Sequence, residues 1–418
     1  MTPSAQPLWR HHDFRIAWSA GFVNDTGDWV LNVALPIFVF VETGSGSATA
    51  LLFVCQLVVG AGLGPFGGVV VDRLDLRRCL IATNLAQAVA VLPLLAVSQD
   101  RVWPAYVVVV AQSALTQVNN PANVALVPRV VHPDRLTEGN AALAASASLA
   151  RLLGAPIGGL LVAWGGLGPI ILIDATSFVV VAASLGFLRV DTSPRPSPDT
   201  DQRRGVRAGL RTVRTHPPLA RLLTIHGVAQ VAQGGFVVLF VAFMVDVLGD
   251  DGAELGLIRG TMAIGALAGS VLIGRLAEQA HPTALYSAGL VGMGSVSALF
   301  WNAPTVSTQL GIYIVLFTLS GIPGSAVSVG LFTTIQTRTP AHAIGRVVGL
   351  MGTAEALGTA TGAILSGILI DRIPLRPLLN AQAAIYITTG ALATVLITRR
   401  HRTRTRGRHH HIAAERRA

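Results

Sequence analysis

Long apolar stretches alternate with short polar segments along most of the chain. Each stretch has about 20 residues or more, enough to cross the roughly 30 Å of hydrocarbon in a bilayer. This pattern predicts an all-α polytopic membrane protein. The expected twelve spans cover about residues 16–41, 48–71, 79–98, 104–128, 138–164, 168–188, 219–248, 254–277, 283–302, 308–333, 344–371 and 376–398.

One polar segment is much longer than the others and divides the chain into halves. Residues 189–217 are rich in Arg, Pro, Ser and Thr, and their end, 203–214, could form a basic amphipathic helix on the membrane surface. We therefore expect four parts in chain order. They are an N-terminal six-helix bundle over 1–188, a cytoplasmic linker over 189–217, a C-terminal six-helix bundle over 218–398 and a basic cytoplasmic tail over 399–418.

The two halves also share short motifs. Two pairs of segments correspond at offsets near half the chain length: 153–159 with 357–363, and Gly68-x-x-x-Asp72 with Gly274-x-x-x-Glu278. A parallel repeat of this kind places a substrate site between the halves, near the bilayer midplane.

Composition excludes several classes of function. The chain is 51% hydrophobic and only 12% charged, about half the charged fraction of a soluble protein. It has no lysine, which excludes a P-loop nucleotide site and Schiff-base chemistry. Because no nucleophile–base or metal-ligand spacing is present, we expect neither an enzyme nor a cofactor or metal site. Cys55 and Cys79 lie in or beside apolar segments and are expected to pack rather than to form a disulfide.

The distribution of arginines predicts the orientation in the membrane. Alternate polar segments carry them: Arg10, Arg15, Arg73, Arg77, Arg78, Arg129, Arg135 and seven in the linker. By the positive-inside rule, both termini and the linker face the cytoplasm from the inner (cytoplasmic) membrane. The loop with Arg372 and Arg376 departs from this rule. We expect the linker and the tail to contact anionic lipid rather than nucleic acid, and the chain to act as a monomer.

Four ionisable residues in or near the middle of predicted spans are candidates for proton coupling, since charge within a membrane is costly. Asp28, Arg151 and Glu355 each lie well inside a span, and the repeat places Arg151 and Glu355 at equivalent positions. Asp25 precedes Asp28 by three residues and shares its helix face. Repulsion between these carboxylates makes proton binding depend on a nearby arginine or substrate. Alternatively, Asp28 and Arg151 form a permanent buried pair that only fixes helix packing.

Other polar and aromatic side chains could line a substrate cavity or serve only as interhelical contacts. The candidates are Asn24, Trp29, Asn32, Gln112, Asn119, Gln230, Gln233 and Phe236. Asp174, Asp246 and Arg259 are expected near the outer surface, where snorkelling or capping accommodates their charge. The pairs Gly154/Gly158 and Gly358/Gly362 predict close helix approach.

The segment Gly68-Val-Val-Val-Asp72-Arg73-Leu74-Asp75-Leu76-Arg77-Arg78 closes the second span. It resembles the loop between helices 2 and 3 of major facilitator superfamily transporters. Segments 27–36, 120–128, 139–141 and 345–349 resemble the macrolide-efflux and enterobactin-exporter branch. The resemblance implies two six-helix bundles and secondary transport by alternating access, commonly export of drugs or siderophores against a proton gradient.

The resemblance also implies a cytoplasmic gate in which Asp72 latches against the start of helix 11, where a helix N-terminus attracts negative charge. The candidate gate residues are Gly68, Asp72, Arg73, Arg77, Arg78, Gly274, Glu278 and Arg346. Three features depart from the family pattern. Asp75 replaces a usual glycine, Pro156 is displaced by one position, and helix 4 lacks a core arginine, for which Arg151 could substitute.

These observations predict a secondary active transporter that exports a drug-like molecule, secondary metabolite or siderophore in exchange for protons. Two alternatives remain open. One is an uptake permease or facilitator on the same fold, and the other is a membrane sensor or scaffold that transports nothing.

Overall fold

Helices account for nearly all of the described chain. The computed structural model describes residues 7–43, 46–98, 101–194, 210–211, 213–248, 253–276, 281–370 and 372–398. The first half contains α1 (His12–Thr43), α2 (Gly46–Arg73), α3 (Leu76–Ala90), α4 (Trp103–Val130), α5 (Leu136–Gly165) and α6 (Leu167–Leu185). The second contains α8 (Pro217–Leu248), α9 (Ala253–Arg275), α10 (Pro282–Asn302), α11 (Leu310–Arg338), α12 (Ile344–Leu369) and α13 (Leu375–Ala393). The fold class is the predicted one.

Within the described residues, nine of these helices are long and apolar enough to cross a membrane by length and composition. Of the other three, α1 and α4 carry several polar residues in their inner turns, and in α9 the apolar stretch Gly260–Arg275 is too short. The α-helix in the third predicted span, 79–98, ends earlier than expected. It ends at Ala90 and continues as a 3₁₀ turn over Leu92–Ala96, because Pro93 has no N–H to donate.

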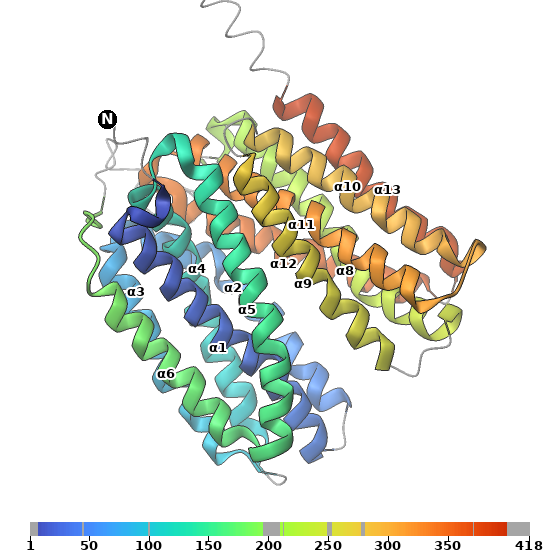
Figure 1. The fold of residues 1–418 in the computed structure, drawn as a ribbon, viewed down its shortest axis with the longest axis horizontal. Coiled ribbons are helices and arrows are strands. Elements are labelled where there is room, and N and C mark those ends of the chain that lie inside the picture. Colours follow the sequence, from blue (N-terminus) through green and yellow to red (C-terminus); the bar gives the residue numbers. More distant parts are fainter. Residues whose placement is uncertain are drawn as a thin grey trace, which may run out of the picture.

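The halves form two groups of helices with related packing. In the first half α5 packs on α1, and in the second half the equivalent α12 packs on α8. Contact between the halves follows the same symmetry, with α2 against α12 and α5 against α9. Figure 1 shows the two groups side by side, close together at the end where α1 begins and diverging toward the opposite end. We call the end where α6 finishes and α8 begins the linker end.

The predicted glycine pairs lie where helix backbones touch. A Cβ at Gly158 of α5 would lie 2.5 Å from the carbonyl oxygen of Val30 in α1. A Cβ at Gly362 of α12 would overlap the carbonyl oxygen of Val231 in α8. The equivalent motifs of the two halves therefore make equivalent close contacts, as the sequence repeat predicts.

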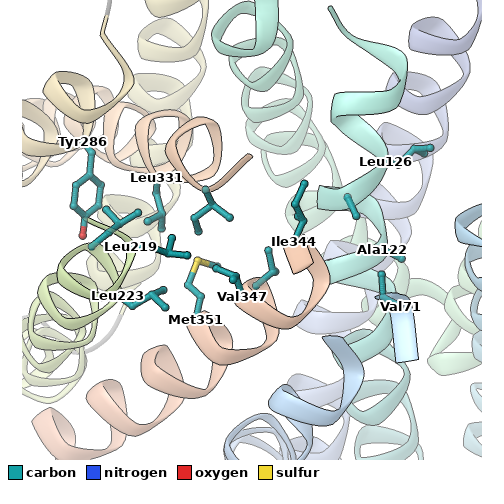
Figure 2. Close-up of a cluster of buried hydrophobic side chains, with 14 of the residues drawn as sticks. Val71, Ala122, Leu126, Leu219, Leu223, Tyr286, Leu331, Ile344, Val347 and Met351 are labelled. Atoms are coloured by element: carbon teal, nitrogen blue, oxygen red, sulfur yellow. The ribbon is translucent and has the colours of Figure 1, made fainter. Parts of the chain in front are cut away.

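A cluster of buried apolar side chains continues from one half into the other. Figure 2 shows α12 residues between side chains of the first half and side chains of the second. The labelled members are Ile344, Val347 and Met351 of α12, with Val71, Ala122 and Leu126 on one side and Leu219, Leu223, Tyr286 and Leu331 on the other. Apolar burial thus joins the halves.

Part of the domain prediction falls outside the described residues. These include 195–209, 212 and the tail from 399 onward, so most of the expected surface helix and the whole basic tail are not described. Residues 186–194 directly after α6 are described, and they lie against the first half, as shown below.

Candidate transport site

A cavity of about 460 Å³ lies between the halves and is lined by residues of both. It extends from the middle of α1 and α12 toward the linker end. Three predicted residues meet at it: Asp25 and Asp28 of α1 and Glu355 of α12. A volume of this size is within the range of small-molecule binding sites.

Each of two cavity carboxylates is held by a neighbouring amide. Asn24 Nδ2 donates to Asp28 Oδ2 at 2.9 Å, one turn earlier on α1. In the second half, Gln230 Nε2 of α8 donates to Glu355 Oε1 at 2.7 Å. Amide donors orient a carboxylate without neutralising its charge. Each half therefore presents an amide-held carboxylate to the space between the halves, within α1 in the first half and between α8 and α12 in the second.

Arg151 lies elsewhere. Its guanidinium carbon is 4.4 Å from the ring centroid of Trp29, the geometry of a cation–π contact, and its side chain is exposed. The residues around the cavity include neither Arg151 nor Trp29. The predicted coupling residues thus divide into three carboxylates at the cavity and an arginine on Trp29.

The other cavity candidates are distributed among several environments. Asn24 and Asn119 line the cavity, and Asn119 also donates to Thr83 Oγ1 at 3.1 Å. Asn32 Nδ2 donates to the backbone oxygen of Asp28 at 2.8 Å, and Gln112 Nε2 donates to the backbone oxygen of Gln87 at 3.0 Å.

The remaining two candidates, Gln233 and Phe236, lie inside the second half. They line a separate and much smaller pocket together with Trp301, Phe317 and Tyr386. Tyr386 donates its hydroxyl to Gln233 Oε1 at 2.8 Å. This pocket is mostly apolar, and its walls come entirely from helices of the second half.

Asp174 is a residue that the sequence analysis misplaced. The sequence suggests a position near the outer surface, but the side chain on α6 is fully buried, and neither carboxylate oxygen has a hydrogen-bond partner. It packs against Gly27 of α1, where an added Cβ would lie 3.1 Å from Asp174 Oδ1. Asp28 is the next residue along α1. The missing side chain of Gly27 and the spacing of Asp174 and Ser177 on one helix face are the sequence signals for this contact.

The predicted gate residue Asp72 contacts the start of α12. Its carboxylate accepts from the backbone N–H groups of Gly345 (3.0 Å) and Arg346 (3.2 Å). Arg346 Nε lies 2.5 Å from Asp72 Oδ2, and both side chains are buried. At Gly68 an added Cβ would overlap the carbonyl oxygen of Gly345, so the two backbones touch. The helix N-terminus and the arginine together provide a strongly favourable site for the carboxylate.

The basic residues after Asp72 have a different role in the fold. Arg77 donates to the backbone oxygens of Gly186 and Leu188, in the segment that follows α6. Asp75, the departure from the family pattern, caps α3 by accepting from the backbone N–H of Arg78 at 2.9 Å. Its other oxygen accepts from Thr192 Oγ1 at 2.8 Å. This part of the loop therefore fastens residues 186–192 to the first half, while the side chains of Arg73 and Arg78 are exposed.

The counterpart of the α2–α12 contact, as related by the repeat, lies between α5 and the second half. It uses neutral groups. Gly274 of α9 lies next to Ala141 of α5, and Glu278 falls outside the described residues. Asn140 Nδ2 of α5 donates to Gln336 Oε1 (2.6 Å) and Thr333 Oγ1 (2.9 Å) of α11. An amide–hydroxyl cluster thus joins the halves beside the ion pair of Asp72 and Arg346.

The sequence model described as the Major Facilitator Superfamily matches the chain twice, over residues 17–249 and 222–413. The chain belongs to the major facilitator superfamily. Members are membrane transporters, so the chain is a multi-pass transporter of small molecules and not an enzyme. Within the described residues there is no group of three or more His, Cys, Asp or Glu side chains placed to hold a metal ion.

Two curated relatives are exporters by name. Macrolide efflux protein A of Streptococcus pyogenes is 24% identical over 368 residues, covering 86% of this chain and 90% of the relative. The enterobactin exporter EntS of Escherichia coli K12 is 26% identical over 409 residues, covering 94% and 93%.

Solved structures show the same fold at lower identity. The human organic anion transporter MFSD10 (TETRAN) matches with a TM-score of 0.75 at 13% identity, covering 93% of this chain and 100% of that one. A bacterial homologue of the iron transporter ferroportin, in an outward-facing state, matches with a TM-score of 0.74 at 19% identity, covering 92% and 98%.

Proposed function

We propose that this transporter exports a small amphipathic molecule in exchange for protons by alternating access. The observation that carries the proposal is the cavity between the halves, to which α1 contributes Asp25 and Asp28 and α12 contributes Glu355. The export direction is supported by the relatives, whose names specify macrolide efflux and enterobactin export.

The linker end faces the cytoplasm in this proposal, since the arginine-rich segments lie there. In this structure the two helix groups are then closed toward the cytoplasm. The ion pair of Asp72 and Arg346 and the cluster of Asn140, Thr333 and Gln336 both lie toward the linker end, and Asn140 and Gln336 also line the cavity. The divergence of the two helix groups at the opposite end supports an outward-facing state (Figure 1).

Proton exchange takes place at the cavity carboxylates. In the outward-facing state Asp28 and Glu355 take up protons as the cargo leaves, and in the inward-facing state cargo binding releases those protons to the cytoplasm. Asp72 and Arg346 separate during the inward step, because α2 must leave the N-terminus of α12 to open the linker end. The arginine-rich linker and tail contact anionic lipid, and the chain works as a monomer.

Everted membrane vesicles test this proposal. A panel of macrolides and other lipophilic compounds is first screened for efflux from cells that produce the chain. Any compound that is exported should then drive release of protons from the everted vesicles, monitored with a pH-sensitive dye. Asp28→Asn should abolish this proton release, whereas Asp134→Asn on an exposed loop should not change it. Undiminished proton release by Asp28→Asn would refute the coupling assignment, and flux independent of protons would favour a facilitator.

A further inference from the structure

The cavity between the halves is charged with one sign only. Of the described residues that line it, Asp25, Asp28 and Glu355 are acidic, and none is Arg, Lys or His. In a chain that has 31 basic and 21 acidic residues, this reverses the overall charge balance. A cleft lined by charge of one sign concentrates ligands of the opposite sign.

The neighbours of these carboxylates leave the charge uncompensated. Asp28 and Glu355 accept hydrogen bonds from the amides of Asn24 and Gln230. Arg346, two to three turns before Glu355 on α12, pairs with Asp72 below the cavity. Behind Asp28, the buried Asp174 supplies no cation either. A bound anion would therefore meet repulsion from several sides and no ionic partner.

The rest of the lining is suited to an amphipathic molecule. Apolar side chains from five helices form much of the wall, namely Phe14, Leu126, Val127, Leu143, Phe332 and Met351. Amides project among them, with Asn120 and Asn123 of α4 exposed to solvent and Gln117 half-buried. The apolar wall favours a lipophilic body, and the amides offer donors and acceptors to its polar substituents.

We infer that the cargo is an organic cation: a lipophilic amine, or a quaternary ammonium or phosphonium ion, whose charge lies among Asp25, Asp28 and Glu355. Anions of the same shape are excluded. This inference rests on the proposed function only in taking the cavity as the transport site. It adds the charge of the cargo to that proposal. The names of the relatives, a macrolide exporter and an enterobactin exporter, do not specify this charge.

Equilibrium binding to the purified full chain in nonionic detergent tests the inference with two ions of the same shape. Tetraphenylphosphonium is the cation and tetraphenylborate is the anion. We expect saturable binding of the phosphonium at one site per chain, and at least tenfold weaker binding of the borate. Asp28→Asn and Glu355→Gln should each weaken phosphonium binding at least tenfold, and Asp28→Glu should retain most of it. Asp134→Asn, in an exposed loop between α4 and α5, should bind as the unchanged protein does.

Three results would overturn the inference. They are equal or tighter binding of the borate, no saturable binding of the phosphonium, or unchanged phosphonium binding when Asp28→Asn and Glu355→Gln are combined. Each variant is compared only if it elutes as a single species with an unchanged melting temperature, so a misfolded protein cannot mimic loss of the site. Binding is measured without a proton gradient. A failure of proton coupling in vesicles would therefore leave these results intact, and the two proposals can fail separately.

Discussion

Asp72 and Arg346 form a buried ion pair between the second helix of one half and the first turn of α12 in the other, with 2.5 Å between Oδ2 and Nε. The carboxylate also accepts two backbone N–H groups of α12. The Asp72 carboxylate is thus stabilised both by the ion pair with Arg346 and by the N-terminus of α12. Because this contact joins the halves at one end only, its strength affects the balance between the two orientations of the cavity more than the fold of either half.

Asp72→Asn should shift that balance toward the state open at the linker end. The substitution leaves Arg346 buried without its counter-charge, which costs about 3–5 kcal/mol in the closed state, equivalent to a population shift of more than about a hundredfold. Double electron–electron resonance can follow this change as the distance between two spin labels, one at Asp134 and one at His281, on exposed loops of the two halves. Both cysteines are replaced first so that only these positions are labelled. The mean distance should increase. Because Asp134 lies on an exposed loop, a label there should be tolerated. An unchanged distance distribution in Asp72→Asn would contradict the role of the Asp72–Arg346 contact as a latch.

Gly68→Val should open the same end without any change of charge. A side chain at this position overlaps the carbonyl oxygen of Gly345, so α2 and α12 must separate by at least a methyl group. Overpacking of this kind costs about 1–3 kcal/mol. Gly62→Val on the same helix is the matched control, because nothing lies within 4 Å of a Cβ there. The same spin-label pair should report opening for Gly68→Val only, and equal distances in the two variants would contradict the predicted contact.

Asp174→Asn should preserve both folding and transport. An ionised carboxylate with no donor and no solvent is costly, so we expect Asp174 to be the neutral acid, which an asparagine replaces at nearly equal volume. Thermal unfolding in detergent should show an equal or higher melting temperature, and proton release from everted vesicles should match the unchanged protein. If Asp174→Asn instead loses proton release as Asp28→Asn is expected to do, Asp174 exchanges protons as well.

Asp75→Ala should loosen the segment after α6. The substitution removes the cap of α3, worth about 1 kcal/mol, together with the acceptor for Thr192 Oγ1. Hydrogen exchange should accelerate in the peptide that covers residues 186–194, while a peptide from the middle of α6 keeps its rate. Asp134→Ala should leave both peptides unchanged. Equal protection of 186–194 in Asp75→Ala would show that the remaining contacts, made by Arg77, Arg129 and Asp13, hold the segment without Asp75.

The sequence predicts the helices and the repeat well because both depend on local patterns. Spans follow from runs of apolar residues, and the alignment of Gly154–Gly158 with Gly358–Gly362 anticipates equivalent contacts of α5 on α1 and α12 on α8. The sequence also predicts a substrate site between the halves, and Asp25, Asp28 and Glu355 line a cavity there.

What the sequence does not provide is the rotation of each helix about its own axis. Arg151 lies over Trp29 rather than at the cavity. The same uncertainty hides Asp174, because its distance along α6 suggests the outer surface while its rotation buries it against Gly27. Hydropathy predicts how deep a residue lies in the membrane. The rotation of a helix about its own axis depends instead on side-chain packing between helices.

The two contacts that close the linker end differ in chemistry, and this gives the gate a preferred sequence of opening. The junction of α2 with α12 contains opposite full charges, whereas the junction of α5 with α11 contains amides and a hydroxyl. Water entering from the linker end stabilises separated charges far more than separated neutral dipoles. We therefore expect hydration to weaken the α2–α12 junction first and the α5–α11 junction after it.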